Sequence, residues 1–219
     1  MEEPTIQADQ VEVLLFDLGG VIIEIDFGRC FASWARAAGG DADADAIRSR
    51  FSMDAAYQAH ERGSIDGLEY FAALRATLEI ELSDADLLVG WNDIFVRAIT
   101  DVDPVLRAAR EKFPLHAFTN SNPTHQAAWF PRFAAELAVF DRTFVSSEIG
   151  LRKPDVEAFA AVATALDTTT DRVLFFDDTP ENVTGARASG MQAVLVNSTA
   201  DVRRALHHVG VNLPDHLVN

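Results

Sequence analysis

Five short apolar runs, separated by helical patterns, constrain the fold of this chain more than any other feature. Each run is rich in β-branched or aromatic residues, which is typical of buried strands. They are Val11–Phe16, Leu115–Phe118, Arg142–Val145, Val173–Phe176 and Ala193–Val196. The helical patterns between them are Pro104–Phe113, Pro123–Val139, Pro154–Leu166 and Pro180–Ser189. This alternation predicts an α/β fold, with a Rossmann-like parallel sheet that carries helices on both faces. Pro131 predicts a kink or a split in the second helix.

The segment that follows the first strand breaks this alternation. It is helical by composition, and we expect no strand in it. Its predicted helices are Arg29–Ala38, Ala44–Ser52, Asp54–Gly63, Ile65–Leu78 and Asp84–Ile99. The chain therefore divides into a predicted core domain, residues 1–26 and 102–219, and a helical bundle, residues 27–101, inserted after the first strand.

Charge and cysteine content exclude several classes of function. The chain has 18 Lys and Arg against 34 Asp and Glu, a net charge of −16, which argues against partners made of nucleic acid or anionic membrane. Its single cysteine, Cys30, excludes an intrachain disulfide and a thiolate metal cluster. The acidic start, Met1–Pro4, lacks a signal-peptide pattern. We expect a cytoplasmic protein, either a monomer or a weak homodimer.

Four polar segments follow predicted strands, at the edge where α/β sheets bind ligands. They are Asp17-Leu18-Gly19-Gly20, Thr119-Asn120-Ser121-Asn122, Arg152-Lys153-Pro154 and Asp177-Asp178. Each of the first three also suits an ordinary turn or loop. The adjacent carboxylates of the fourth repel each other unless a cation lies nearby, and oxygen ligands suit Mg²⁺.

In this order, the four segments resemble the motifs of the haloacid dehalogenase-like hydrolase superfamily. Asp17 resembles its nucleophile, and Thr119, Lys153 and Asp177-Asp178 resemble its second, third and fourth motifs. The resemblance covers nearly the whole chain, because the helical insertion stands where that superfamily has its type-1 cap. At a finer level, the chain resembles the bacterial α-D-glucose-1-phosphate phosphatases. That resemblance is carried by Phe16–Val21, Glu24–Phe27, His60–Gly63 and Arg152–Pro154.

The resemblance implies a Mg²⁺-dependent phosphatase that works through an aspartyl-phosphate. Its substrate would be a small phosphorylated metabolite, such as an aldose 1-phosphate. The implied catalytic residues are Asp17, Lys153 and Thr119. The implied metal ligands are Asp17, the Gly19 carbonyl and Asp178, with Asp177 as a second or water-mediated ligand. Backbone N–H groups of Gly20 and Asn120 would hold phosphate oxygens, and Arg62, His60 and Glu61 are candidate substrate contacts.

Gly19 departs from the superfamily pattern. Most of its phosphatases have there a second Asp that protonates the leaving oxygen, and such general acid–base help contributes about 10²–10⁴-fold. Two alternatives stay open: a metal-independent haloacid dehalogenase, and a module that binds a phosphate ester with little turnover. The Asp177-Asp178 pair favours the phosphatase over the dehalogenase.

Overall fold

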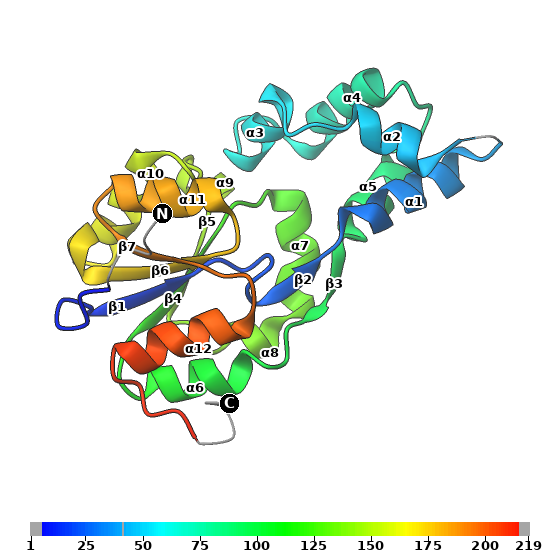
Figure 1. Ribbon diagram of the computed structural model, residues 1–219. Helices are drawn as coiled ribbons and strands as arrows, with labels where there is room; N and C mark the ends of the chain where they lie inside the picture. Colours follow the sequence, from blue (N-terminus) through cyan, green and yellow to red (C-terminus); the bar gives the residue numbers. More distant parts are fainter. Residues whose placement is uncertain (1–5, 41, 215–219) are drawn as a thin grey trace.

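A parallel sheet forms the centre of the computed structural model, which describes residues 6–40 and 42–214. Within that part of the chain, its five strands are ordered β5-β4-β1-β6-β7 (Figure 1). Their bounds are β1 (Val13–Phe16), β4 (Leu115–Thr119), β5 (Arg142–Val145), β6 (Val173–Asp177) and β7 (Gln192–Leu195). All four pairings are parallel. The α/β fold predicted from the sequence is therefore confirmed.

Helices cover both faces of this sheet. Side chains alternate along β1, so Leu14 and Phe16 join one hydrophobic cluster while Val13 and Leu15 join the other. The first cluster includes residues of α6 (Asp103–Arg110) and α12 (Thr199–His208). The second includes residues of α10 (Val156–Ala165) and α11 (Pro180–Ala188). β1 is therefore buried on both faces, as a central parallel strand must be.

The helix predicted to break at Pro131 is divided in the structure. α7 (Pro123–Arg132) ends one residue after this proline, and the short α8 (Ala134–Leu137) follows Phe133. Two short helical segments complete this part of the molecule, α9 (Ser146–Ile149) and the 3₁₀ turn η1 (Thr170–Arg172). The predicted split is thus confirmed.

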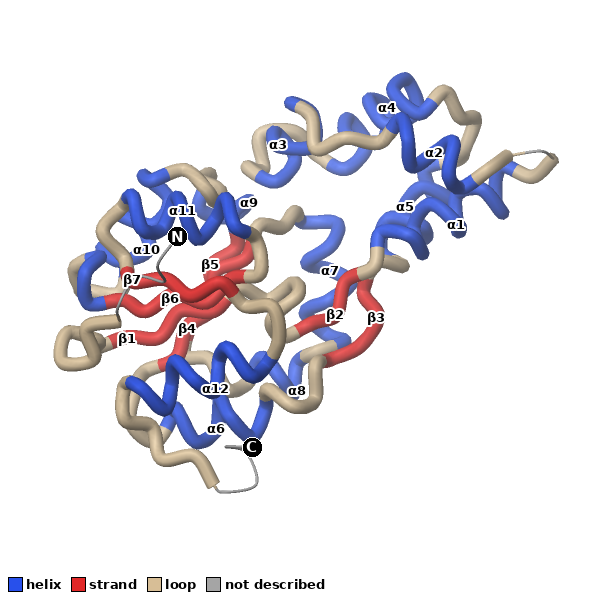
Figure 2. The backbone as a smooth tube through the Cα atoms, viewed as in Figure 1, coloured by secondary structure: helices blue, strands red, loops and turns tan. Residues whose placement is uncertain are grey.

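Five helices between residues 27 and 92, here called the helical insertion, stand to one side of the sheet (Figures 1 and 2). They are α1 (Phe27–Ala38), α2 (Ala44–Arg50), α3 (Ala55–Glu61), α4 (Gly67–Leu78) and α5 (Asp84–Asn92). Buried aromatic rings hold them together: Trp34 stacks on Trp91, and Trp91 contacts Tyr70. Within the described residues, no helix has the length and apolar character needed to cross a membrane.

Two short antiparallel strands connect the insertion to the sheet, β2 (Ile23–Ile25) and β3 (Phe95–Ala98). The expectation of one helix over Asp84–Ile99, and of no strand in this segment, was wrong. α5 ends at Asn92, and the residues beyond it pair with β2. Arg97 and Glu24 form a cross-strand ion pair with Nε and Oε2 2.6 Å apart. Pairing with a distant segment has overridden the local helical pattern.

Candidate active site

The sheet topology brings the four polar segments to one edge. β1 lies between β4 and β6, so Asp17, Thr119 and Asp177 end neighbouring strands. Lys153 reaches the same place from the loop between α9 and α10. All four segments line one cavity of about 410 Å³, a size that suits a small molecule.

Lys153 is the centre of the charge network at this edge. Its side chain is 1% exposed, and its Nζ lies 2.8 Å from Asp17 Oδ1 and 2.6 Å from Asp177 Oδ2. Burial opposes its charge, but the two carboxylates outweigh burial and raise the pKa of Lys153. The Asn120 amide fixes its backbone, donating to the Lys153 carbonyl at 2.8 Å and accepting from the Lys153 N–H at 2.9 Å. Lys153 is therefore a buried, positioned ammonium group.

The two adjacent carboxylates have different surroundings. Asp177 is fully buried, and its oxygens accept hydrogen bonds from Lys153, the Thr179 N–H and the Asn182 amide. Asp178 is more exposed, and its carboxylate accepts a hydrogen bond from the Thr179 hydroxyl at 3.3 Å. Burial, together with the charge of Asp177, raises the pKa of Asp178. Of the pair, Asp178 is thus freer to bind a ligand.

The pKa of Asp17 is raised to about 7, chiefly by burial, which the charge of Lys153 opposes. The charges of Asp177 and Asp178 raise it further. Lys153 Nζ lies 2.8 Å from its Oδ1, and apart from Lys153 this oxygen has no hydrogen-bond partner among the described residues. Asp17 therefore has an electron pair left for another partner.

These carboxylates fit a divalent cation. One oxygen from each of Asp17, Asp177 and Asp178 can be chosen so that all lie within 4.8 Å of one another. A set made only of oxygen atoms suits Mg²⁺, which takes one or two protein carboxylates and keeps other positions for water or phosphate. The Asp178 carboxylate also covers Gly20, where an added Cβ would lie 2.0 Å from Asp178 Oδ2. The absence of a side chain at Gly20 is what lets this carboxylate approach.

At Gly19, an apolar side chain occupies the neighbouring space. A Cβ at this position would lie 3.3 Å from Ile25 Cγ1 and 4.0 Å from Asp17 Oδ2. A carboxyl group at position 19 would therefore start beside the nucleophile candidate and press against Ile25. Ile25 therefore borders the side of Gly19 from which a side chain would project.

The structure brings most, but not all, of the sequence-predicted site residues to the cavity. Those on its lining are Asp17, Gly19, Gly20, Thr119, Asn120, Lys153 and Asp178, while Asp177 lies behind them, bound to Lys153. Arg62 and His60 do not line it. Arg62 forms an ion pair with Asp155, with Nη2 and Oδ2 2.7 Å apart. His60 is 1% exposed, contacts the Ile65 carbonyl and stacks on Tyr70.

Sequence reasoning missed Asn182, and it named Glu61 as a candidate substrate contact without foreseeing its pairing with Arg152. Asn182, five residues after Asp177 in the first turn of α11, donates to both oxygens of that carboxylate. Glu61 of α3 lines the cavity and forms an ion pair with Arg152, with Oε2 and Nη2 2.7 Å apart. The available signal for Asn182 was an Asn in the first turn of the helix that follows Asp177. No local signal reveals the ion pair between Glu61 and Arg152, because these residues are 91 positions apart in the sequence.

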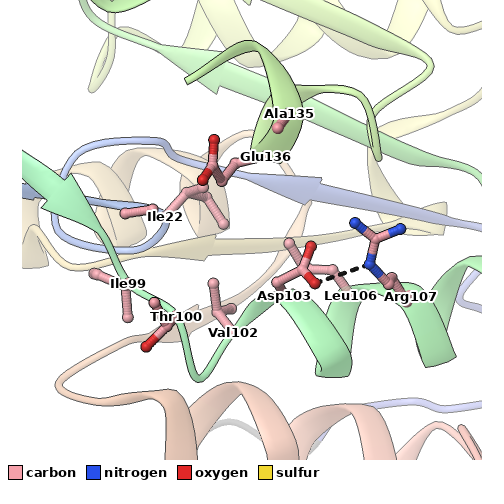
Figure 3. Close-up of a pocket in the computed structure, with 10 residues that line it drawn as sticks. Ile22, Ile99, Thr100, Val102, Asp103, Leu106, Arg107, Ala135 and Glu136 are labelled. Atoms are coloured by element: carbon pink, nitrogen blue, oxygen red, sulfur yellow. Dashed lines mark hydrogen bonds and ion pairs between the residues drawn. The ribbon is translucent and has the colours of Figure 1, made fainter. Parts of the chain in front are cut away.

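A second cavity, of about 290 Å³ (Figure 3), shares no lining residue with the first. Its lining includes Ile22, Ile99, Leu106 and Glu136, and the exposed ion pair between Arg107 and Asp103. Its lining includes neither Lys153 nor the carboxylates of Asp17, Asp177 and Asp178. The candidate catalytic residues therefore line the cavity of about 410 Å³ and not this one.

Comparison with known proteins agrees with this geometry. The chain is 34% identical over 137 residues to a phosphatase of Mycobacterium tuberculosis, a match that covers 62% of this chain and 63% of that protein. It is 24% identical over 202 residues to the D-ribitol-5-phosphate phosphatase of Bacteroides thetaiotaomicron, covering 90% of this chain and 97% of that protein. A solved magnesium complex of a haloacid dehalogenase family enzyme from B. thetaiotaomicron superposes with a TM-score of 0.72 at 25% identity, covering 85% and 93% of the two chains. The model of the haloacid dehalogenase-like hydrolases matches residues 11–190, and the chain belongs to that family.

Proposed function

We propose that this protein is a Mg²⁺-dependent phosphomonoester hydrolase that works through an aspartyl-phosphate. The observation that carries the proposal is the position of Lys153 Nζ, 2.8 Å from Asp17 and 2.6 Å from Asp177, inside a cavity of small-molecule size. A buried cation beside a carboxylate with a free electron pair suits attack on an anionic phosphate. The named phosphatases among its relatives support the same chemistry.

In the proposed first step, Asp17 attacks phosphorus and the bond to the leaving oxygen breaks. Lys153 offsets the negative charge of Asp17 and of the phosphate oxygens, while the Thr119 hydroxyl and the backbone N–H group of Asn120 position them. The backbone N–H of Gly20, for which the sequence resemblance implied the same role, donates instead to the Ile23 carbonyl at 2.8 Å. Water then hydrolyses the aspartyl-phosphate and regenerates Asp17. Because these groups are held before substrate arrives, little reorganisation is needed during the reaction.

The metal ion would be held by Asp17, Asp178 and the Gly19 carbonyl. Asp177 would not contact it first, because its carboxylate is bound to Lys153. Bound Mg²⁺ supplies positive charge against the phosphate and the carboxylates. We propose that residues 27–101 form the cap over the cavity and that residues 1–26 and 102–219 form the core. In such an arrangement the cap selects the leaving group and excludes stray water.

The glycine at position 19 limits the substrates. Because Gly19 has no side chain, the leaving oxygen gains no protonation from this position, so a weakly basic leaving group is favoured. Aldose 1-phosphates belong to this class, because the anomeric oxygen is less basic than a simple alkoxide. Gly19 also favours the second candidate, a module that binds phosphate esters with little turnover.

A phosphate-release screen with Mg²⁺ or with EDTA tests the proposal, using the wild-type protein and Asp17→Asn. We expect release that requires Mg²⁺, disappears in the variant and is accompanied by phosphorylated Asp17 in acid-quenched enzyme, detected by mass spectrometry. Binding of phosphate esters without release would support the module instead. Chloride release from a 2-haloacid without metal would overturn the proposal in favour of a dehalogenase.

A further inference from the structure

The side of the cavity formed by the helical insertion and its connecting strands is mostly apolar. Eight of the lining residues fall between positions 23 and 95, and six of these have apolar side chains. The six are Ile23, Ile25, Phe27, Met53, Ile94 and Phe95. Met53 is 54% exposed, so it lies where the cavity meets solvent. A leaving group that extends from the phosphate toward the insertion therefore meets hydrocarbon.

The two polar residues on that side are already paired. Glu61 is 4% exposed and accepts from Arg152 Nε at 2.8 Å. The Tyr57 hydroxyl also bonds to Glu61. Burial favours the neutral form of Glu61, while Arg152 supports its charge. A hydroxylated substrate would have to break this buried network to gain hydrogen bonds there.

Polar side chains on the sheet side are engaged as well. Ser121 accepts from Trp129 Nε1 at 3.0 Å, and Asn182 donates to Asp177. Both ring nitrogens of His125 have partners, the Asn122 amide and the Trp91 carbonyl. The Asn120 amide is bound to the backbone of Lys153. The cavity thus presents groups for one phosphate, but few side chains for the many hydroxyls of a sugar.

We infer that the preferred substrate is a phosphomonoester of a phenol or an enol with a largely hydrocarbon skeleton, so that the leaving oxygen is a phenolic or enolic one. The inference rests on the proposed function and narrows its substrate class. The lack of a side chain at Gly19 favours the weakly basic oxygen, and the apolar lining favours the hydrocarbon body. A phenol has a pKa of about 10, as in tyrosine, and departs as the phenolate without an acid. The phosphorus–oxygen bond breaks with its electron pair on the phenolate, phosphate passes to Asp17, and solvent later protonates the phenolate.

A series of 4-alkylphenyl phosphates, from methyl to hexyl, tests this inference, because chain length changes the apolar area while leaving-group basicity stays nearly constant. We expect kcat/KM with Mg²⁺ to rise by up to about fourfold for each methylene group that the cavity buries. The longer members should also exceed glucose 1-phosphate. A flat or falling series, with phosphate still released, would overturn the inference and leave the proposed function standing. No release from any substrate would overturn the proposed function.

A pair of matched variants locates the effect. Met53→Ser removes an apolar side chain from the cavity lining, whereas Leu68→Ser removes one of similar exposure, 61% against 54%, from outside that lining. We expect the hexyl-to-methyl ratio of kcat/KM to fall several-fold in the first variant and to stay at its wild-type value in the second. Equal ratios in both variants would contradict the assignment. Binding of the same series to Asp17→Asn, followed by calorimetry, measures the chain-length dependence without turnover.

Discussion

The two sides of the cavity differ in chemistry. The sheet side carries Asp17, Lys153 and Asp178, held by loops that follow parallel strands. The insertion side is largely hydrocarbon, and its one carboxylate, Glu61, is paired with Arg152. Under the proposed function, this difference separates the residues that carry out the reaction from those that select the substrate. Substitutions on the sheet side should change the chemical step, and substitutions on the insertion side should change which leaving groups are accepted.

The largest expected effect is at Asp17. Asp17→Asn should lower kcat by at least about 10⁴-fold, because it removes the proposed nucleophile. Its free energy of unfolding in metal-free buffer should equal or exceed that of the wild-type protein, since burial already disfavours the ionised form of Asp17 and raises its pKa to about 7. Phosphate release and urea unfolding measure the two quantities. Asp101→Asn, at an exposed position, is the control and should change neither. Residual activity within tenfold of wild type would exclude Asp17 as the nucleophile.

The next effect concerns the two ion pairs that join the end of α3 to the loop around Lys153. The first pair is buried, because the side chains of Glu61 and Arg152 are 5% and 13% exposed. In the second pair, the side chains of Arg62 and Asp155 are 32% and 38% exposed. Glu61→Gln should reduce the free energy of unfolding by about 3–5 kcal/mol, because it leaves the Arg152 cation buried and unpaired.

Asp155→Asn is the matched comparison, and it should cost only about 0.2–1 kcal/mol because solvent screens the exposed pair. Urea unfolding of both single variants, and of Glu61→Gln combined with Arg152→Met, measures these values. The double variant should recover part of the loss. Similar costs for the two single variants would show that burial does not distinguish the pairs.

A smaller effect is expected at Gly20. Gly20→Ala would place a Cβ 2.0 Å from Asp178 Oδ2, so the carboxylate must move. We expect Mg²⁺ affinity, followed through the metal dependence of phosphate release, to fall by about 10–100-fold. Gly150→Ala is the matched control, because both glycines have φ of +72° but nothing lies within 4 Å of the position of a Cβ at Gly150. An equal fall in both variants would point to backbone strain instead of displacement of Asp178.

The sheet side was predictable from the sequence because its residues follow strands. Parallel strands meet at one edge, so Asp17, Thr119 and Asp177 had to lie together once the strands were recognised. The insertion side was not predictable in the same way. Neighbouring residues on a helix point about 100° apart, since a turn holds 3.6 residues. Glu61 therefore faces the cavity while His60 and Arg62 do not, and only packing decides which of the three does so.

The smallest expected effect tests the boundary between the two sides, at His125. This histidine of α7 contacts the Trp91 carbonyl of the insertion through Nε2, 3.0 Å away, and stacks on the Trp91 ring. Burial lowers the pKa of His125 to about 3, and the neighbouring His60 lowers it further, against the hydrogen bond to Trp91. The Asn122 amide donates to Nδ1, while the oxygen of that amide caps α7, so a second proton on the ring would break an established contact.

Because the folded-state pKa of His125 lies below its unfolded value of about 6.5, the unfolded chain binds more protons below that pH. The stability that neutral His125 contributes is therefore present above about pH 6.5 and is lost as the pH falls toward 3. Between pH 7.5 and 5, this loss amounts to about 2 kcal/mol. His125→Gln, measured by urea unfolding at both pH values, should reduce the pH dependence of the free energy of unfolding by that amount. His207→Gln, at an exposed position, is the control for the substitution itself. If the free energy of unfolding depends on pH in the same way in both variants, the loss of stability in acid arises from other groups. His125 then does not couple protonation to the contact between the insertion and the sheet.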